Sequence, residues 1–121
     1  MLRSPLHFLD DIKEAASNIR KYTTDMSYDQ FLGDRRTQDA VVRNFEIIGE
    51  AVRNLPEDLK ARHPDTPWKR ISGFRDIMIH GYHRVDYEIV WNMINTTLPA
   101  FSTEIVKILR EEERREKQVK R

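Results

Sequence analysis

The residues best suited to chemistry stand together in the segment GFRDIMIHGYHR, which covers residues 73–84. Arg75 and His80 are five positions apart in it, and Asp76 stands four positions before His80. A histidine with a near-neutral pKa can take a proton from an RNA 2′-hydroxyl or give one to a leaving oxygen. An arginine fork can stabilise the negative charge that builds on phosphorus. Because RNA supplies its own nucleophile, this pair of side chains suits phosphodiester cleavage without a metal.

A helix is the element expected to position these residues. Thr66–Pro67 can begin it as a cap followed by a first-position proline, and the helix is expected to run to about Gly81. Asp76 and His80 would then lie one turn apart, so the carboxylate could hold the imidazole in one tautomer. Arg75 and His80 would point about 140° apart. They share a site only if the arginine wraps around, the helix distorts near Gly81, or two chains each contribute.

Two other interpretations of the same segment remain open. Four side chains of the metal-ligand type stand at close spacing: Asp76, His80, His83 and Asp86. Gly81 interrupts the helix that would align them, and no second cluster completes a shell, so neither a metal nor another cofactor is expected. The charged groups can also be ordinary ion pairs of a helix surface, which is the interpretation that composition alone favours.

The overall charge excludes a protein that binds nucleic acid through its whole surface. The formal net charge of the 121 residues is only +1. Residues 67–84 differ, since they hold four basic residues against one acidic residue. A small basic patch is therefore expected beside the Arg–His pair, and three of its members are candidate contacts to an RNA backbone: Lys69, Arg70 and Arg84.

The chain has no cysteine, which excludes disulfides and thiolate nucleophiles. No apolar run approaches the roughly 20 residues that a membrane-spanning helix needs. The beginning, MLRSPLHFLDD, has no apolar region typical of a signal peptide. We therefore expect a cytoplasmic protein with no membrane partner.

Apolar residues recur at helical spacing along most of the chain, which predicts an all-α, up-and-down bundle of four to five main helices. A long helix is expected over residues 35–55, where apolar residues alternate in steps of four and three. Pro99 is expected to break or kink the chain between the last two helices. Four polar residues can cap helices at their beginnings: Ser4, Ser27, Asp34 and Asp86.

The chain is expected to form one helical domain over residues 1–109, followed by a charged, frayed helical tail over residues 110–121. The tail has the sequence REEERREKQVKR, in which charges of both signs alternate and almost no residue is apolar. It can therefore contribute almost nothing to a core. Two histidines outside the 73–84 segment, His7 and His63, are isolated in the sequence and expected on the surface.

Several blocks of the sequence resemble one known family in their order and spacing. They are RNFEIIGEAVRNLP at 43–56, PWKRISGFRD at 67–76, IHGYHRVDYEIVW at 79–91 and LPAF at 98–101. In addition, Arg75-x4-His80-x-Tyr82 is similar to the R-x4-H-x-Y signature of HepT-like toxins in the HEPN superfamily. The resemblance covers nearly the whole chain except the charged tail.

This resemblance implies a helical bundle that forms a homodimer, with two R-x4-H motifs near a cleft at the interface. It implies metal-independent cleavage of RNA as a toxin, with an MntA-like nucleotidyltransferase as the antitoxin of a type VII pair. Arg75 and His80 would be catalytic, and Tyr82 would receive AMP from the antitoxin. Many superfamily members carry Asn where this chain has Asp76, a carboxylate that repels phosphate but orients His80 better.

A non-catalytic subunit is the alternative to the enzyme. Such a chain would bind a nucleotide or a nucleotidyltransferase partner through the same cleft. In either case a homodimer is expected, because the helix with the motif has apolar residues nearly all round: Ile71, Phe74, Ile77, Met78 and Ile79.

Overall fold

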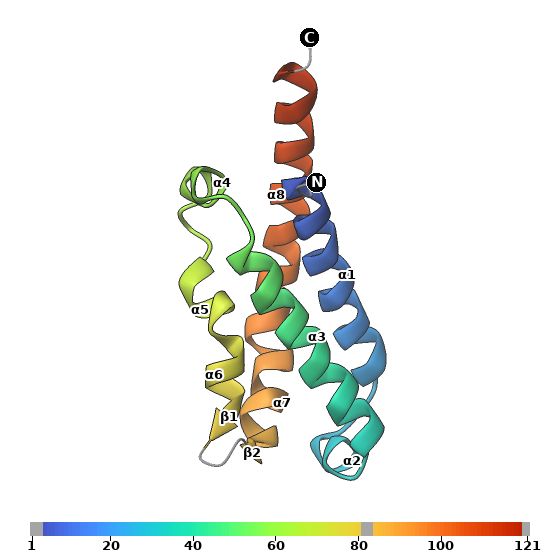
Figure 1. Ribbon diagram of the computed structural model, residues 1–121. Coiled ribbons are helices and arrows are strands. Elements are labelled where there is room, and N and C mark those ends of the chain that lie inside the picture. Colours follow the sequence, from blue (N-terminus) through green and yellow to red (C-terminus); the bar gives the residue numbers. More distant parts are fainter. Residues whose placement is uncertain (1–3, 81–83, 120–121) are drawn as a thin grey trace.

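The protein is a bundle of α-helices, as predicted (Figure 1). The structure, a computed structural model, describes residues 4–80 and 84–119. The long helices are α1, α3 and α8, and α7 is of intermediate length. In chain order the elements are α1 Pro5–Thr23, α2 Tyr28–Leu32, α3 Arg35–Arg53, α4 Glu57–Arg62, α5 Trp68–Ser72, α6 Phe74–Met78, β1 Ile79–His80, β2 Arg84–Val85, α7 Tyr87–Asn95 and α8 Thr97–Val119.

The four predicted caps are confirmed, because each side chain accepts a hydrogen bond from a backbone N–H of the first helical turn. Ser27 and Gln30 form a reciprocal capping box at α2. Asp34 accepts from the backbone N–H of Thr37 at 3.1 Å and from its hydroxyl at 2.6 Å. These bonds to Thr37 lower the pKa of Asp34 below its usual value. Local chemistry therefore fixes where these helices begin.

Helix α3 is the central element of the bundle. It packs along α1 and, elsewhere on its surface, against α5 and α6 (Figure 1). Its apolar residues are fully buried, as their spacing predicts: Val41, Phe45, Ile48 and Val52. The opposite side of α3 is polar and accessible. It borders the same surface cleft as Arg75.

The single helix predicted from Pro67 to about Gly81 is wrong in its continuity and in its end. Two short helices, α5 and α6, meet at Gly73, and α6 ends at Met78. Ile79 is already extended, with φ −110° and ψ 127°. The backbone N–H of Asp86 donates to the carbonyl of Met78 at 2.7 Å, so a tight hairpin takes the place of the next helical turn. Its two strands pair antiparallel, Ile79 with Val85 and His80 with Arg84.

Thr66 does not cap α5 as predicted. Helix α5 has no side-chain cap, and the hydroxyl of Thr66 is buried without a hydrogen-bond partner among the described residues. Because an unpaired buried polar group destabilises a fold, this hydroxyl between α4 and α5 slightly lowers the free energy of unfolding.

The end of the chain also differs from expectation. The break between the last two helices lies at Thr96, and Pro99 sits in the first turn of α8, where a missing N–H costs nothing. Helix α8 then continues without interruption to Val119, and Glu112 is buried. The residues of the expected tail are thus helical as far as Val119, and one of them, Glu112, contacts α4.

Candidate active site

Arg75 and Asp76 lie in the first turn of α6, and both side chains are exposed. Because Phe74 and Met78 of the same short helix are buried in the core, α6 is held in place and its polar side faces outward. Among the described residues, none forms an ion pair with Arg75. Its guanidinium is therefore accessible to a ligand.

His80 stands at the end of β1, where its backbone pairs with Arg84. Because the helix ends at Met78, the predicted one-turn neighbour relation between Asp76 and His80 on a helix is not formed. The side chain of His80 and residues 81–83, with Tyr82 and His83, lie outside the described part of the chain. A distortion of the helix near Gly81 is one of three conditions under which Arg75 and His80 can share a site. The helix does end before Gly81, at Met78.

The metal-site interpretation gains no support from the residues that can be placed. Asp86 accepts a hydrogen bond from the backbone N–H of Ile89 and caps α7. Within residues 4–80 and 84–119, no three side chains of the His, Cys, Asp or Glu type gather as a metal site would require.

Arg75 borders a polar cleft of about 400 Å³ between α3 and the α5–α6 turn. No pattern in the sequence predicts this cleft. Its lining consists of Arg43, Glu46, Gly49, Glu50, Arg53, Ser72 and Arg75. Three guanidinium groups thus border one concave surface with two carboxylates. The spacing of three, four and three positions between the charged residues of α3 marks one helix face in the sequence, but only the fold places it next to Arg75.

Gly49 fixes the distance between α3 and α5 at the base of this cleft. A Cβ atom at this position would lie 3.3 Å from the carbonyl oxygen of Ile71 and 3.4 Å from that of Ser72. Few real Cβ contacts are so short, so the two backbones approach as closely as they do because position 49 has no side chain. Through the turn at Gly73, this approach also places α6 and Arg75.

The cleft that contains Arg75 does not include the other members of the predicted basic patch. Lys69, Arg70 and Arg84 are exposed, as a contact to RNA would require. None of the three lines the cleft that contains Arg75. The other two guanidiniums of the cleft belong to Arg43 and Arg53 on α3. Helices α4 and α5 separate them from Arg75 in the sequence.

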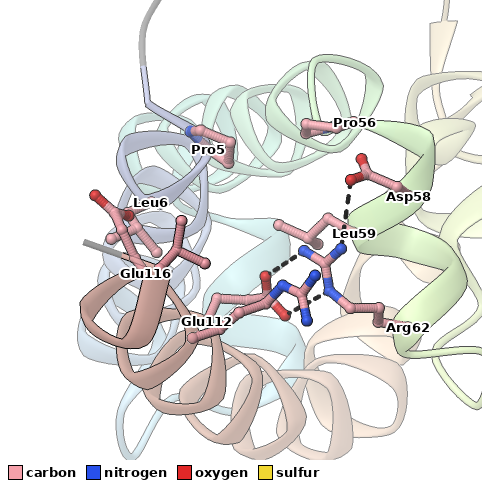
Figure 2. A pocket seen from close by; sticks show the side chains of 10 residues that line it. Pro5, Leu6, Pro56, Asp58, Leu59, Arg62, Glu112 and Glu116 are labelled. Carbon is pink, nitrogen blue, oxygen red and sulfur yellow. Dashed lines mark hydrogen bonds and ion pairs between the residues drawn. The ribbon is translucent and has the colours of Figure 1, made fainter. Parts of the chain in front are cut away.

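A second polar cluster joins α4 to α8, and it corrects the prediction that His63 lies on the surface. Arg62 donates from Nη2 to Oε1 of Glu112 at 2.6 Å and from Nε to Oε2 at 3.3 Å (Figure 2). His63 Nε2 lies 2.8 Å from the same Oε2 atom, and the His63 side chain is only 10% exposed. Sequence reasoning missed this cluster because its partners are about 50 positions apart.

The electrostatics of this cluster favour the charged carboxylate. Burial raises the pKa of Glu112, but hydrogen bonds from Arg62 and His63 and their positive charge outweigh it, so the pKa lies below its ordinary value of 4.5. The pKa of Arg62 is raised, chiefly because its guanidinium donates to Glu112. All three groups are occupied with one another, and the neighbouring cavity of about 210 Å³ is lined mainly by apolar atoms of α1, α4 and α8 (Figure 2). This cluster therefore has a structural role.

The all-α bundle is consistent with a HEPN-like fold, and Arg75 is exposed in it beside an arginine-lined cleft. A family model described as "Ribonuclease HepT-like" matches residues 12–108. Because this match covers most of the sequence, the chain belongs to the HepT-like ribonuclease family.

Individual relatives agree with this assignment. A protein of Methanocaldococcus jannaschii named as an inferred RNase is 44% identical over 104 residues, which are 86% of each chain. A protein of Thermococcus cleftensis named as an inferred ribonuclease HepT is 39% identical over 108 residues, 89% of this chain and 98% of that one. A protein of Caldanaerobacter subterraneus named as an inferred RNase is 35% identical over 111 residues, 92% and 99% of the two chains. No solved structure matches the chain.

No helix within residues 4–80 and 84–119 is long and apolar enough to cross a bilayer.

Proposed function

We propose that this chain is the toxin of a toxin–antitoxin pair and cuts RNA without a metal ion. The observation that carries the proposal is the exposed guanidinium of Arg75 in a cleft with two further arginines, five positions before His80. A negatively charged phosphodiester is the ligand that such a group of guanidiniums suits best.

In the proposed reaction, the 2′-oxygen of a ribose attacks the adjacent phosphorus and the 5′-oxygen of the next nucleotide leaves. His80 takes the proton of the 2′-hydroxyl or supplies one to the leaving oxygen. Arg75 stabilises the extra negative charge on the phosphorane. In this proposal Asp76 retains the role of orienting His80, although the two residues are not one turn apart on a helix. The products are a 2′,3′-cyclic phosphate and a 5′-hydroxyl.

The active form in this proposal is a homodimer with both Arg–His motifs near the interface cleft. Of the apolar residues that predict a partner, Ile71, Phe74 and Met78 are buried within the single chain. Ile77 and Ile79 are partly buried and pack at the edge of the core. The apolar surface left for a partner is thus smaller than the sequence indicates, and polar contacts must contribute to the interface.

Control of the toxin is proposed to occur at Tyr82. An MntA-like nucleotidyltransferase would transfer AMP from ATP to the tyrosine hydroxyl, with release of pyrophosphate and a proton. The anionic adduct would repel the RNA backbone and compete for Arg75. Intact mass measurement after co-expression tests this step: an AMP adduct that Tyr82→Phe abolishes supports it, and full neutralisation without an adduct contradicts it.

The nuclease proposal is tested with purified protein, labelled RNA and EDTA. Cleavage that leaves a 2′,3′-cyclic phosphate is expected, and His80→Ala should reduce its rate by about 10²–10⁴-fold, the range for general acid–base catalysis. Arg110→Ala is a matched control, since Arg110 is exposed on α8 and does not line the cleft. Undiminished cleavage by His80→Ala would overturn the assignment. Absence of cleavage together with tight partner binding would favour the non-catalytic subunit, which the repulsive carboxylate of Asp76 also suits.

A further inference from the structure

We infer that the cleft between α3 and α6 is a binding site for the RNA backbone, in which Arg43 and Arg53 hold phosphates on either side of Arg75. This inference rests on the proposed function, because RNA is its ligand. It assigns substrate contacts to α3, whereas the sequence alone indicated only residues near the Arg–His pair.

The positions of the arginines suit a chain of phosphates. Arg43 and Arg53 are ten positions apart on one helix, which corresponds to about 15 Å along its axis. Arg75 reaches the same cleft from α6. Three guanidiniums at separate points of one groove can each bind a different phosphate of a single strand, and such contacts position a nucleic acid without reading its sequence.

The base of the cleft carries only small residues. At Gly49 the backbone of α5 lies directly against α3, so backbone and the small Ser72 form the base of the cleft. The hydroxyl of Ser72 donates to the carbonyl of Lys69 at 2.8 Å, so its oxygen can still accept a bond. No bulky side chain from α5 therefore fills the space between the two arginine-bearing elements. A ribose–phosphate chain can approach this floor closely.

The carboxylates of the cleft do not neutralise its arginines permanently. Arg53 Nη1 lies 3.5 Å from Glu50 Oε2, and these side chains are 52% and 71% exposed. An exposed pair of this kind contributes little to stability, so a phosphate can replace the carboxylate at small cost. Glu46 and Glu50 instead lower the affinity, and their removal should increase it.

The lining favours RNA over a protein partner. It consists of arginine, glutamate, glycine and serine, without one large apolar side chain. The centre of a stable protein interface is typically apolar and aromatic. Phosphate groups, in contrast, need guanidinium donors rather than apolar surface.

Binding of a fluorescein-labelled oligouridylate to the His80→Ala protein, measured over a series of salt concentrations, tests the inference. Each phosphate contact to single-stranded RNA contributes about 0.7 to the slope of log affinity against log salt. Arg43→Gln and Arg53→Gln should each reduce the slope by about this amount. Arg110→Gln, an exposed arginine outside the cleft, should leave it unchanged.

A second pair of variants should change the affinity in the opposite direction. Glu50→Gln removes a repulsive charge and releases Arg53, so RNA should bind roughly threefold more tightly, the size of effect of one exposed charge pair. Glu113→Gln on α8 is the control, because Glu113 is exposed and does not line the cleft. Damage to the fold cannot produce tighter binding.

Three results would overturn the inference. One is an unchanged salt slope in both arginine variants. Another is an unchanged RNA affinity with a shifted dimer equilibrium in sedimentation, which would make the cleft a protein surface. The third is displacement of the RNA by AMP as effectively as by unlabelled RNA, which would make it a nucleotide pocket. Failure of the nuclease proposal is separate, since parental protein would then not cut RNA while these binding measurements still report on the cleft.

Discussion

The cluster between α4 and α8 and the cleft between α3 and α6 are built from similar charged residues, but they differ in what those residues contact. In the first, the Arg62 fork holds both oxygens of Glu112, and the carboxylate is only 7% exposed. In the second, Arg53 meets Glu50 at 3.5 Å, and both side chains are more than half exposed. The first set of charges is satisfied within the chain, whereas the second remains accessible.

This difference separates a structural role from a ligand-binding role. Charges withdrawn from water are tolerated only when partners replace the lost hydration, and breaking such a pair leaves an unpaired charge. Exposed charges keep their hydration and can exchange partners at small cost. Residue type alone therefore does not reveal function, but exposure together with hydrogen-bond partners does.

The largest expected effect is the loss of RNA cleavage when an arginine of the cleft is replaced. Arg75→Ala should reduce RNA cleavage by about 10²–10³-fold, because it removes a donor to the developing charge on phosphorus. The free energy of unfolding should change by less than about 0.5 kcal/mol, since the side chain is exposed. Single-turnover cleavage and urea unfolding measure the two quantities. A large loss of stability would place Arg75 with the structural charges and break the comparison.

The opposite result is expected at the α4–α8 cluster. Glu112→Ala should lower the free energy of unfolding by about 3 kcal/mol, because it leaves Arg62 and His63 without their shared partner. Glu113→Ala, its exposed neighbour, should change it by less than about 0.5 kcal/mol. Cleavage per folded molecule should match the parental protein. Lost cleavage with intact stability would show that this cluster takes part in function.

Acid should weaken the same cluster. Because the pKa of Glu112 is lowered in the folded protein, the unfolded state binds more protons once the pH falls below about 4.5. The contribution of Glu112 to stability is present above that pH and is lost as pH falls through the depressed folded pKa. One proton accounts for at most about 1.4 kcal/mol per pH unit. Urea unfolding at a series of pH values should show a shallower acid dependence in Glu112→Gln, and an identical dependence would contradict the lowered pKa.

The smallest effect concerns the buried hydroxyl between α4 and α5. Thr66→Val keeps the shape of the side chain and removes an oxygen that has no partner among the described residues, so stability should rise by about 1 kcal/mol. Thr103→Val, where the exposed hydroxyl donates to the carbonyl of Pro99, is the control and should give no gain. Thermal unfolding measures both. A loss of stability in Thr66→Val would mean that the hydroxyl is paired after all.

Features of the fold that depend on neighbouring residues could be predicted from the sequence. The caps at Ser27 and Asp34 use residues within one turn, and the apolar stripe of α3 follows from its spacing. The end of α6 could not be predicted in this way. The run Ile77–Met78–Ile79 fits a buried helix or a strand, and the hydrogen bond from Asp86 to Met78 decides for the hairpin.

The candidate site was predicted in part for the same reason. Arg75 is recognisable because it stands in a dense motif, and its exposure agrees with a site. Arg43 and Arg53 join it only because Gly49 lets α5 approach α3, a tertiary contact that no local pattern reveals. His63 looks isolated in the sequence, since its partner Glu112 lies 49 positions away.

The long separation between α4 and α8 has a kinetic consequence. Helices α1 and α3 follow one another closely in sequence and pack together, so their contact closes a short loop. The pair formed by Arg62 and Glu112 spans 50 positions, and its formation costs more chain entropy. We expect this contact to be absent from the folding transition state, so that its loss accelerates unfolding and hardly slows refolding. The cluster would then set how long the bundle stays folded, not how fast it forms.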